Sequence, residues 1–231
     1  MRVAMIGATG LTGRALAPLI SASHQLHLLG RRASGFDGRE TIAAAEDWPA
    51  HLGSEPLDLA ISALGTTWAK AGSWSAFEAV DHDAVLGFAR AARAVGARQF
   101  ITISSVGAER GSRNSYLALK GRVEGALAEI GFDRLDIMRP GLLRGPRGSD
   151  RRRGERLGIL VSPLVNLVLR GPLDHFAAID AATVAAAIAA LVGARANGVF
   201  IHHNREINRM AGGRRLHRRN DRPLRHRPGP L

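Results

Sequence analysis

The chain has 231 residues, enough for one well-buried core but short for two domains, and 45% of them are hydrophobic, as a globular fold requires. It contains no cysteine, which excludes disulfides and thiolate chemistry and favours a reducing compartment such as the cytoplasm. The net charge is +12, but residues 205–231 carry nine arginines against two acidic residues, a net +7. This leaves only +5 for the other 204 residues and does not favour a nucleic-acid-binding fold.

Short apolar runs alternate with longer segments of helical periodicity, a pattern typical of β-α-β units and a parallel sheet. The expected strands are Val3–Ile6, Gln25–Leu29, Leu57–Ala63, Gln99–Ser104, Arg134–Met138 and Gly198–His202, with Thr41–Ala45 as one further candidate. The expected helices are Leu11–Ser21, Ala76–Val95, Ser115–Ile130, Leu157–Arg170 and Ala181–Val192. We therefore predict an α/β fold, a doubly wound parallel sheet of Rossmann type.

This pattern predicts a single domain over residues 1–204, with a small substrate region at about 142–180. The last segment is rich in arginine, glycine, proline and histidine and has almost no apolar periodicity. We therefore expect a basic, disordered tail over 205–231, with Gly198–His202 as the last element of the fold.

No segment is expected to act as a secretory signal or to cross a membrane. Met1-Arg2 leads directly into the first strand, without a signal-peptide pattern. The apolar stretch 157–169 is too short to span a bilayer, and the stretch 176–196 is mostly alanine and contains Asp180 and Arg195.

The first motif that carries chemistry is the glycine-rich run Gly7-Ala8-Thr9-Gly10-Leu11-Thr12-Gly13, between the first strand and the first helix. Glycines permit a tight turn and let the backbone approach a pyrophosphate at the positive end of the helix dipole. Such a turn can also be purely structural, but its strand–turn–helix context favours a dinucleotide. The residues expected to bind this cofactor are Gly7, Thr9, Gly10, Leu11, Thr12 and Gly13.

The second motif is the pair Arg31 and Arg32, directly after the second strand. An NAD-specific domain usually places an acidic residue here, where it binds the ribose 2′-hydroxyl. A guanidinium instead pairs with a 2′-phosphate through a bidentate fork. An exposed basic loop is the alternative, but together with the glycine-rich turn the pair predicts NADP.

The third motif is Tyr116 followed four residues later by Lys120 on a predicted helix, a spacing that places both side chains on one face. An ammonium beside a tyrosine stabilises the phenolate, which lets the tyrosine exchange a proton with a carbonyl or alcohol oxygen. Tyr116 is the only tyrosine of the chain. The alternative is an ordinary pair on a helix surface.

Two further motifs follow predicted strands, at the edge where ligands bind in open α/β sheets. Ser104 and Ser105 lie at the end of one strand, and either hydroxyl can hold a substrate oxygen beside Tyr116. Pro140 and Gly141 follow another strand and form a turn whose backbone can meet the nicotinamide. Each motif alone is ordinary turn chemistry, so its value comes from its order with the others.

Together these motifs resemble the atypical short-chain dehydrogenase/reductase family over about residues 1–204. The more local runs resemble the HIV Tat-interacting oxidoreductase-like group; they are Leu64-Gly65-Thr66-Thr67, Lys70-Ala71-Gly72, Phe132-Asp133-Arg134 and Arg139-Pro140-Gly141. The resemblance implies cofactor contacts for the Ala63-Leu64-Gly65 turn and catalytic roles for Ser105, Tyr116 and Lys120. The chain departs from the family in its short substrate region, which argues against a large sugar-nucleotide pocket.

The function expected from the resemblance is an NADP-dependent oxidoreductase acting on a small-molecule carbonyl or alcohol. Tyr116 would handle the proton, Lys120 would tune Tyr116 and hold the ribose, and Ser105 would orient the substrate. Two alternatives remain open: an NAD(P)-dependent epimerase, and an NADP-sensing regulatory protein that binds a protein partner without turnover. A nucleic-acid binder is disfavoured because only 5% of residues are aromatic. No metal site is expected.

Overall fold

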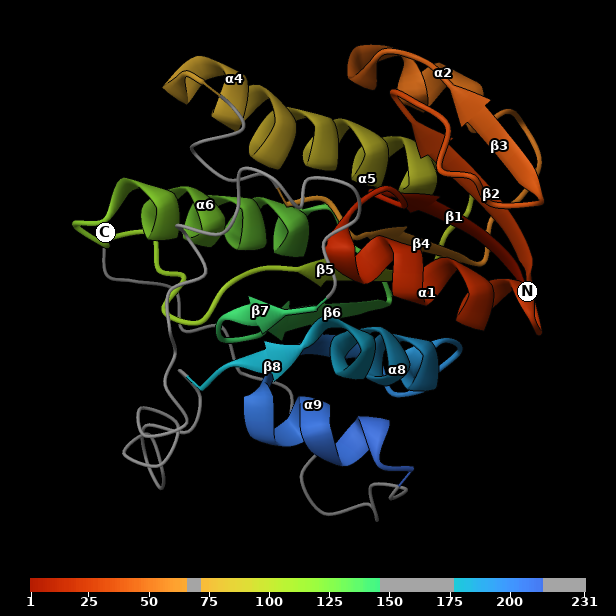
Figure 1. Cartoon of the computed structure of the whole chain (residues 1–231). Coiled ribbons are helices and arrows are strands. Elements are labelled where there is room, and N and C mark those ends of the chain that lie inside the picture. Colours follow the sequence, from red (N-terminus) through yellow and green to blue (C-terminus); the bar gives the residue numbers. More distant parts are fainter. Residues whose placement is uncertain (66–71, 146–176, 214–231) are drawn as a thin grey trace.

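The structure, a computed structural model, describes residues 1–65, 72–145 and 177–213. Within these residues a sheet of seven parallel strands has the order β3-β2-β1-β4-β5-β6-β9 (Figure 1). The strands are β1 Arg2–Ile6, β2 Gln25–Gly30, β3 Arg39–Ile42, β4 Leu59–Ser62, β5 Gln99–Ile103, β6 Arg134–Arg139 and β9 Gly198–His203. The strand order reverses between β1 and β4, where open α/β sheets form a ligand-binding crevice.

Helices cover both faces of this sheet (Figure 1). One face packs on α1 Leu11–Ser21, α8 Ala181–Leu191 and α9 Asn204–Ala211. The other packs on α2 Trp48–His51, α5 Ala84–Ala94 and α6 Ser115–Glu129, and α4 Trp74–Glu78 runs into α5 through a π-helical turn, η2 Ala79–Asp83.

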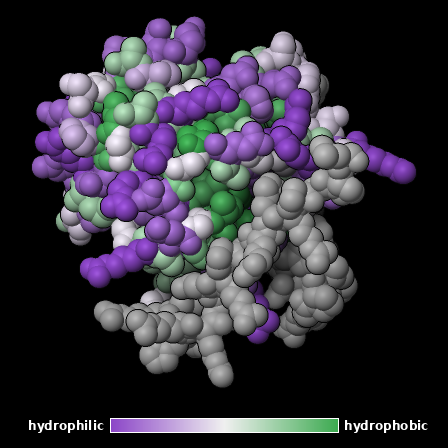
Figure 2. Space-filling view, turned by 180° about the vertical axis from the view of Figure 1, so that it is seen from behind, coloured by the Kyte–Doolittle hydropathy of each residue, from purple (hydrophilic) through white to green (hydrophobic). Residues whose placement is uncertain are grey.

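The two cores take alternate residues of the same strands, as side chains on a pleated strand require. In β1, Met5 joins the core under α1 and α8, whereas Ala4 and Ile6 join the core under α2 and α5. Strands β4 and β5 are buried along their whole length, because helices cover both of their faces. Figure 2 shows hydrophobic residues along the middle of one surface, between hydrophilic margins.

The doubly wound α/β fold is confirmed. One strand differs in place: the further candidate Thr41–Ala45 is β3, Arg39–Ile42, at the edge of the sheet. Few residues of an edge strand need to be buried, so its sequence need not be apolar. The polar Arg39 and Glu40 at its start were therefore not recognised as part of the strand. The expected helix Ala76–Val95 begins earlier, in α4, and its regular period is broken by η2.

Gly198–His202 is not the last element, and that expectation is wrong. Helix α9 follows β9 directly, and its Ile207 and Met210 are buried in the core with α8. The apolar pattern did not predict this helix, because its two large apolar residues lie among charged ones such as Arg205 and Arg209.

Two short strands lie outside the main sheet: β7 Leu143–Arg144 and β8 Ile179–Asp180, which pair in parallel. The two ends of the segment 142–180, the predicted substrate region, therefore lie side by side. The expected helix Leu157–Arg170 and residues 214–231 of the expected tail lie outside the described residues. In the described part of the chain no helix combines the length and apolarity needed to cross a bilayer.

Candidate active site

The glycine-rich turn packs against the end of β4 so closely that two of its positions require glycine. Gly7 has a φ of +89°, and a Cβ there would lie 2.4 Å from the carbonyl carbon of Ala63. A Cβ on Gly13 would lie 2.1 Å from the oxygen of Gly7. The Ala63-Leu64-Gly65 turn and the glycine-rich turn, predicted separately, thus meet at the crevice between β1 and β4.

The amino end of α1 has no side-chain cap among the described residues. Gly10 is its N-cap and has no side chain to accept hydrogen bonds from the first-turn amides. The Thr12 hydroxyl is buried without a hydrogen-bond partner among the described residues. A backbone that leaves no room for a Cβ and a helix end with uncapped N–H groups fit a dinucleotide pyrophosphate.

Arg31 and Arg32 follow the carboxyl end of β2 and are both exposed. Neither guanidinium has a hydrogen-bond or ion-pair partner within residues 1–65, 72–145 and 177–213. The two side chains are therefore available to an anion beside the glycine-rich turn, since β2 and β1 are neighbours in the sheet.

Helix α6 carries Tyr116 and Lys120 on one face, as predicted. The Asn114 side chain caps this helix by accepting hydrogen bonds from the amides of Tyr116 at 3.0 Å and Leu117 at 3.2 Å. The Lys120 ammonium lies 5.9 Å from the centroid of the Tyr116 ring. Lys120 is buried, whereas Tyr116 is 37% exposed, so the phenol is the part of this pair that solutes can reach.

Sequence reasoning missed the partner of Lys120. The ammonium forms an ion pair with Asp81 of η2, with 2.5 Å between Nζ and Oδ1, and both side chains are buried. The π-helical turn shifts the helical period and turns Asp81 inward; such turns are frequent at functional sites. In the sequence, Asp81 is one of several charged residues of the expected helix Ala76–Val95, and nothing marks it as buried.

The two serines after β5 have different surroundings. The Ser104 hydroxyl is buried and donates to Glu124 of α6. Ser105 is half-buried, and its hydroxyl makes only a long contact, 3.3 Å, with the oxygen of Val106. Of the two hydroxyls, that of Ser105 is the more exposed and has the weaker hydrogen bond, so it is the better candidate to bind a ligand.

The Pro140–Gly141 turn lies beside these serines. The amide of Val106 donates to the oxygen of Pro140 at 3.1 Å, and the amide of Gly141 donates to the Asn204 side chain at 2.9 Å. Farther along, a Cβ on Gly145 would lie 3.0 Å from the Leu11 side chain at the amino end of α1. The turn after β6 thus reaches back to the glycine-rich motif.

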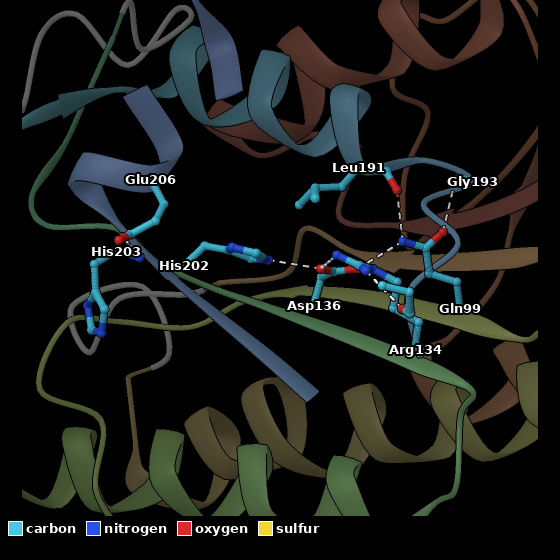
Figure 3. A network of polar contacts seen from close by, with 9 residues as sticks. Gln99, Arg134, Asp136, Leu191, Gly193, His202, His203 and Glu206 are labelled. Carbon is cyan, nitrogen blue, oxygen red and sulfur yellow. Dashed lines mark hydrogen bonds and ion pairs between the residues drawn. The ribbon is translucent and has the colours of Figure 1, made fainter. Parts of the chain in front are cut away.

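A second group of buried polar residues lies on the face of the sheet that α8 covers (Figure 3). The Asp136 carboxylate accepts hydrogen bonds from Gln99 at 2.8 Å, Arg134 at 2.7 Å and His202 at 2.9 Å. Burial raises the pKa of Asp136, but the hydrogen bonds from His202 and Arg134 outweigh this effect and hold it below the ordinary value. Gln99 and Arg134 begin their strands, Asp136 lies in the middle of β6, and His202 is next to the last residue of β9. This network therefore ties β5, β6 and β9 together.

No family model matches the chain. Solved structures with a similar fold include UDP-glucose 4-epimerase from Thermotoga maritima with UDP-glucose: 13% identity, TM-score 0.63, 88% of this chain and 77% of that one covered. A short-chain dehydrogenase/reductase superfamily protein from Agrobacterium tumefaciens with bound NAD has 16% identity and a TM-score of 0.62, with 88% and 77% covered. At such low identity this likeness concerns the fold alone.

Curated relatives are closer in sequence, and all of those named here are FMP52 proteins. The protein from Emericella nidulans is 38% identical over 64% of this chain and 70% of its own length. The one from Coccidioides immitis is 32% identical over 84% and 89%, and the one from Aspergillus niger 31% over 91% and 98%. They replace the narrower resemblance to the Tat-interacting group.

The relatives also correct one expectation. A cytoplasmic location was inferred from the absence of cysteine and of a signal peptide, and the relatives from these three fungi are all named as mitochondrial. Cysteine content reports a reducing environment and does not distinguish between compartments that share one. By the identity and coverage it shares with these relatives, the chain belongs to the FMP52 family.

Proposed function

We propose that the chain is an NADP-dependent oxidoreductase that interconverts a carbonyl and an alcohol on a small molecule. The observation that carries the proposal is the arrangement on α6, where an accessible Tyr116 lies beside the buried ammonium of Lys120. The fit of the glycine-rich turn to a dinucleotide supports the cofactor half of the proposal.

The chain's own residues would divide the work as follows. A bound nicotinamide supplies or receives the hydride. Tyr116 donates a proton to the substrate oxygen in reduction and takes one in oxidation. Lys120 stabilises the phenolate that Tyr116 becomes and holds the ribose. Ser105 donates a hydrogen bond to the substrate oxygen and so orients the reacting carbon.

The cofactor would lie along the crevice between β1 and β4. The pyrophosphate would bind at the amino end of α1, over Gly7, Gly10 and Gly13, with backbone and side-chain contacts from Thr9, Leu11 and Thr12. Arg31 and Arg32 would hold a 2′-phosphate. The turns at Ala63-Leu64-Gly65 and Pro140–Gly141 would flank the rest of the molecule.

The test is NADPH oxidation by the purified chain with panels of aldehydes, ketones and quinones, followed by the Tyr116→Phe variant on any substrate found. The variant keeps the ring and loses the hydroxyl, so turnover should fall by about 10²-fold or more while NADPH binding persists. Turnover at the parental rate would remove Tyr116 from the mechanism. A parent that binds NADPH but oxidises it with none of these compounds would favour the regulatory alternative.

We also propose that the chain acts in mitochondria, because the relatives carry that location in their names. Fractionation of cells that make the protein, with immunodetection beside mitochondrial and cytosolic markers, checks this. Recovery with the cytosolic marker alone would contradict it.

A further inference from the structure

Three hydrogen bonds converge on one buried carboxylate of α6, that of Glu124. Tyr116, Lys120 and Glu124 are spaced four residues apart and so share one face of the helix. Glu124 accepts from the Ser104 hydroxyl and from two nitrogens of Arg139: Nε lies 3.0 Å from Oε1, and Nη2 lies 2.5 Å from Oε2. The Glu124 side chain is only 8% exposed.

These bonds join three segments that the proposed function requires. Ser104 directly precedes Ser105, Arg139 directly precedes Pro140, and Glu124 lies one turn beyond Lys120. The backbone reinforces the connection, because the amide of Ser104 donates to Met138 at 2.7 Å. The amide of Val106 likewise donates a hydrogen bond to the oxygen of Pro140. The residues on either side of Ser105 are thus both hydrogen-bonded to the chain at the end of β6.

Stability alone is a poor explanation for this cluster. A buried ion pair loses in desolvation about as much as it gains in attraction, and apolar replacements of similar volume are often neutral or stabilising. What such a pair does provide is a defined geometry, since a bidentate guanidinium–carboxylate contact fixes both distance and orientation. Reaction rates are sensitive to this, because a misplacement of about 1 Å can cost about 10²-fold in rate.

We propose that Glu124 and Arg139 are positioning residues: they set Ser105 and the Pro140–Gly141 turn relative to Tyr116 and Lys120 without touching substrate themselves. The inference rests on the proposed function for its kinetic consequence. Its structural consequence, a fixed conformation of residues 104–107 and 140–142, can be measured without turnover.

The test uses Glu124→Gln and Arg139→Lys in the full chain. In Glu124→Gln one acceptor oxygen is replaced by an NH₂ group, which cannot accept a hydrogen bond from the guanidinium. In Arg139→Lys the positive charge remains, but the bidentate contact with the carboxylate is lost. Both variants should lower kcat by about 10-fold or more, while the substrate KM and the pH–rate profile stay near those of the parent, because neither residue carries a reacting proton. Ser104→Ala is a milder third variant that removes a single hydroxyl.

Two matched controls separate positioning from loss of stability. Arg122→Gln breaks an exposed ion pair of the same helix, with Glu78 at 2.7 Å. Asp136→Asn disturbs a buried carboxylate that is also hydrogen-bonded to an arginine, but in the middle of β6 and on the face of the sheet that α8 covers. Arg122→Gln should leave melting temperature and kcat unchanged, and Asp136→Asn should lower the melting temperature without lowering kcat of the folded protein.

Hydrogen–deuterium exchange with saturating NADPH gives the readout that needs no substrate. Glu124→Gln should speed amide exchange in residues 104–107 and at Gly141 and Leu142, and Arg122→Gln should not. Equal exchange in these two variants overturns the inference, and so does a kcat for Glu124→Gln equal to that of Arg122→Gln. If no substrate is found, the exchange experiment alone tests whether Glu124 fixes these two segments. Failure of the proposed function can thus be distinguished from failure of the positioning role.

Discussion

Lys120 is a buried ammonium whose counter-ion, Asp81, comes from a different helical segment. Such a charge is tolerated only when it is paired, because the desolvation cost is several kcal/mol per ion. The pairing also fixes where the ammonium lies, 5.9 Å from the ring of Tyr116. At this position a single carboxylate thus serves both the stability of the fold and the geometry of the proposed site.

Asp81→Leu should therefore cost about 3–5 kcal/mol of unfolding free energy, because it leaves Lys120 buried and unpaired. The double variant Asp81→Leu/Lys120→Met leaves no buried charge and should recover most of this loss. Urea unfolding of both variants beside the parent measures the difference. A double variant less stable than the single one would show that the unpaired ammonium is not the cause.

Arg31→Ala and Arg32→Ala should each weaken NADPH binding by about 1.5–3 kcal/mol and leave NADH binding unchanged, because only NADPH carries the 2′-phosphate. Fluorescence titration with both cofactors measures this. Arg90→Ala, an exposed arginine of α5, is the control and should bind both cofactors as the parent does. Equal affinity of the parent for NADPH and NADH would argue against NADP preference.

His27 makes stability depend on pH. Burial, with smaller contributions from the charges of Arg39 and His51, lowers the pKa of His27 to about 4 from 6.5. As pH falls from 6.5 toward 4, the unfolded chain binds a proton that the folded chain does not, so stability is full above 6.5 and falls across this interval. Urea midpoints of the parent and of His27→Leu across this range measure the effect. A parental decline that His27→Leu does not reduce would assign it to other groups.

At the scale of elements, periodicity predicted the strands and long helices because each buries a continuous or regularly spaced apolar face. Helix α6 is an example, with Asn114 as its cap and Leu119, Val123 and Leu127 in the buried face. The elements that were not predicted lack such a regularly spaced apolar face. In η2 the period itself changes, and in α9 two apolar residues lie among polar and charged ones.

Helix α9 can be tested at its buried position. Ile207→Ala removes a fully buried side chain from the core with α8 and should cost about 2–5 kcal/mol of unfolding free energy. Arg205→Ala, exposed on the same helix, should change stability by less than about 0.5 kcal/mol. Denaturant unfolding of both measures this; equal stabilities would mean that α9 does not pack as described.

For the molecule as a whole, the sequence predicted the sheet, the glycine-rich turn and the spacing of Tyr116 and Lys120, because all of these are local patterns. It did not predict what each buried charge is paired with. Lys120 lies 39 positions from Asp81, and Ser104 lies 20 positions from Glu124. Both acids are present in the sequence, but nothing local distinguishes them from acids that face solvent, so only the fold identifies their partners.

The pairing of β7 with β8 has a consequence for how the length of the chain can vary within this family. The Asn204 side chain bonds to the chain just before each of these strands, accepting from the amide of Gly141 at 2.9 Å and donating to the oxygen of Ala177 at 2.7 Å. The pairing of the strands and the contacts of Asn204 thus bring residues 141–144 and 177–180 to one place. Closing a loop costs only about 0.6 kcal/mol more each time its length doubles. Relatives can thus differ in the length of chain between these two strands while the seven-stranded sheet and the glycine-rich turn stay in place.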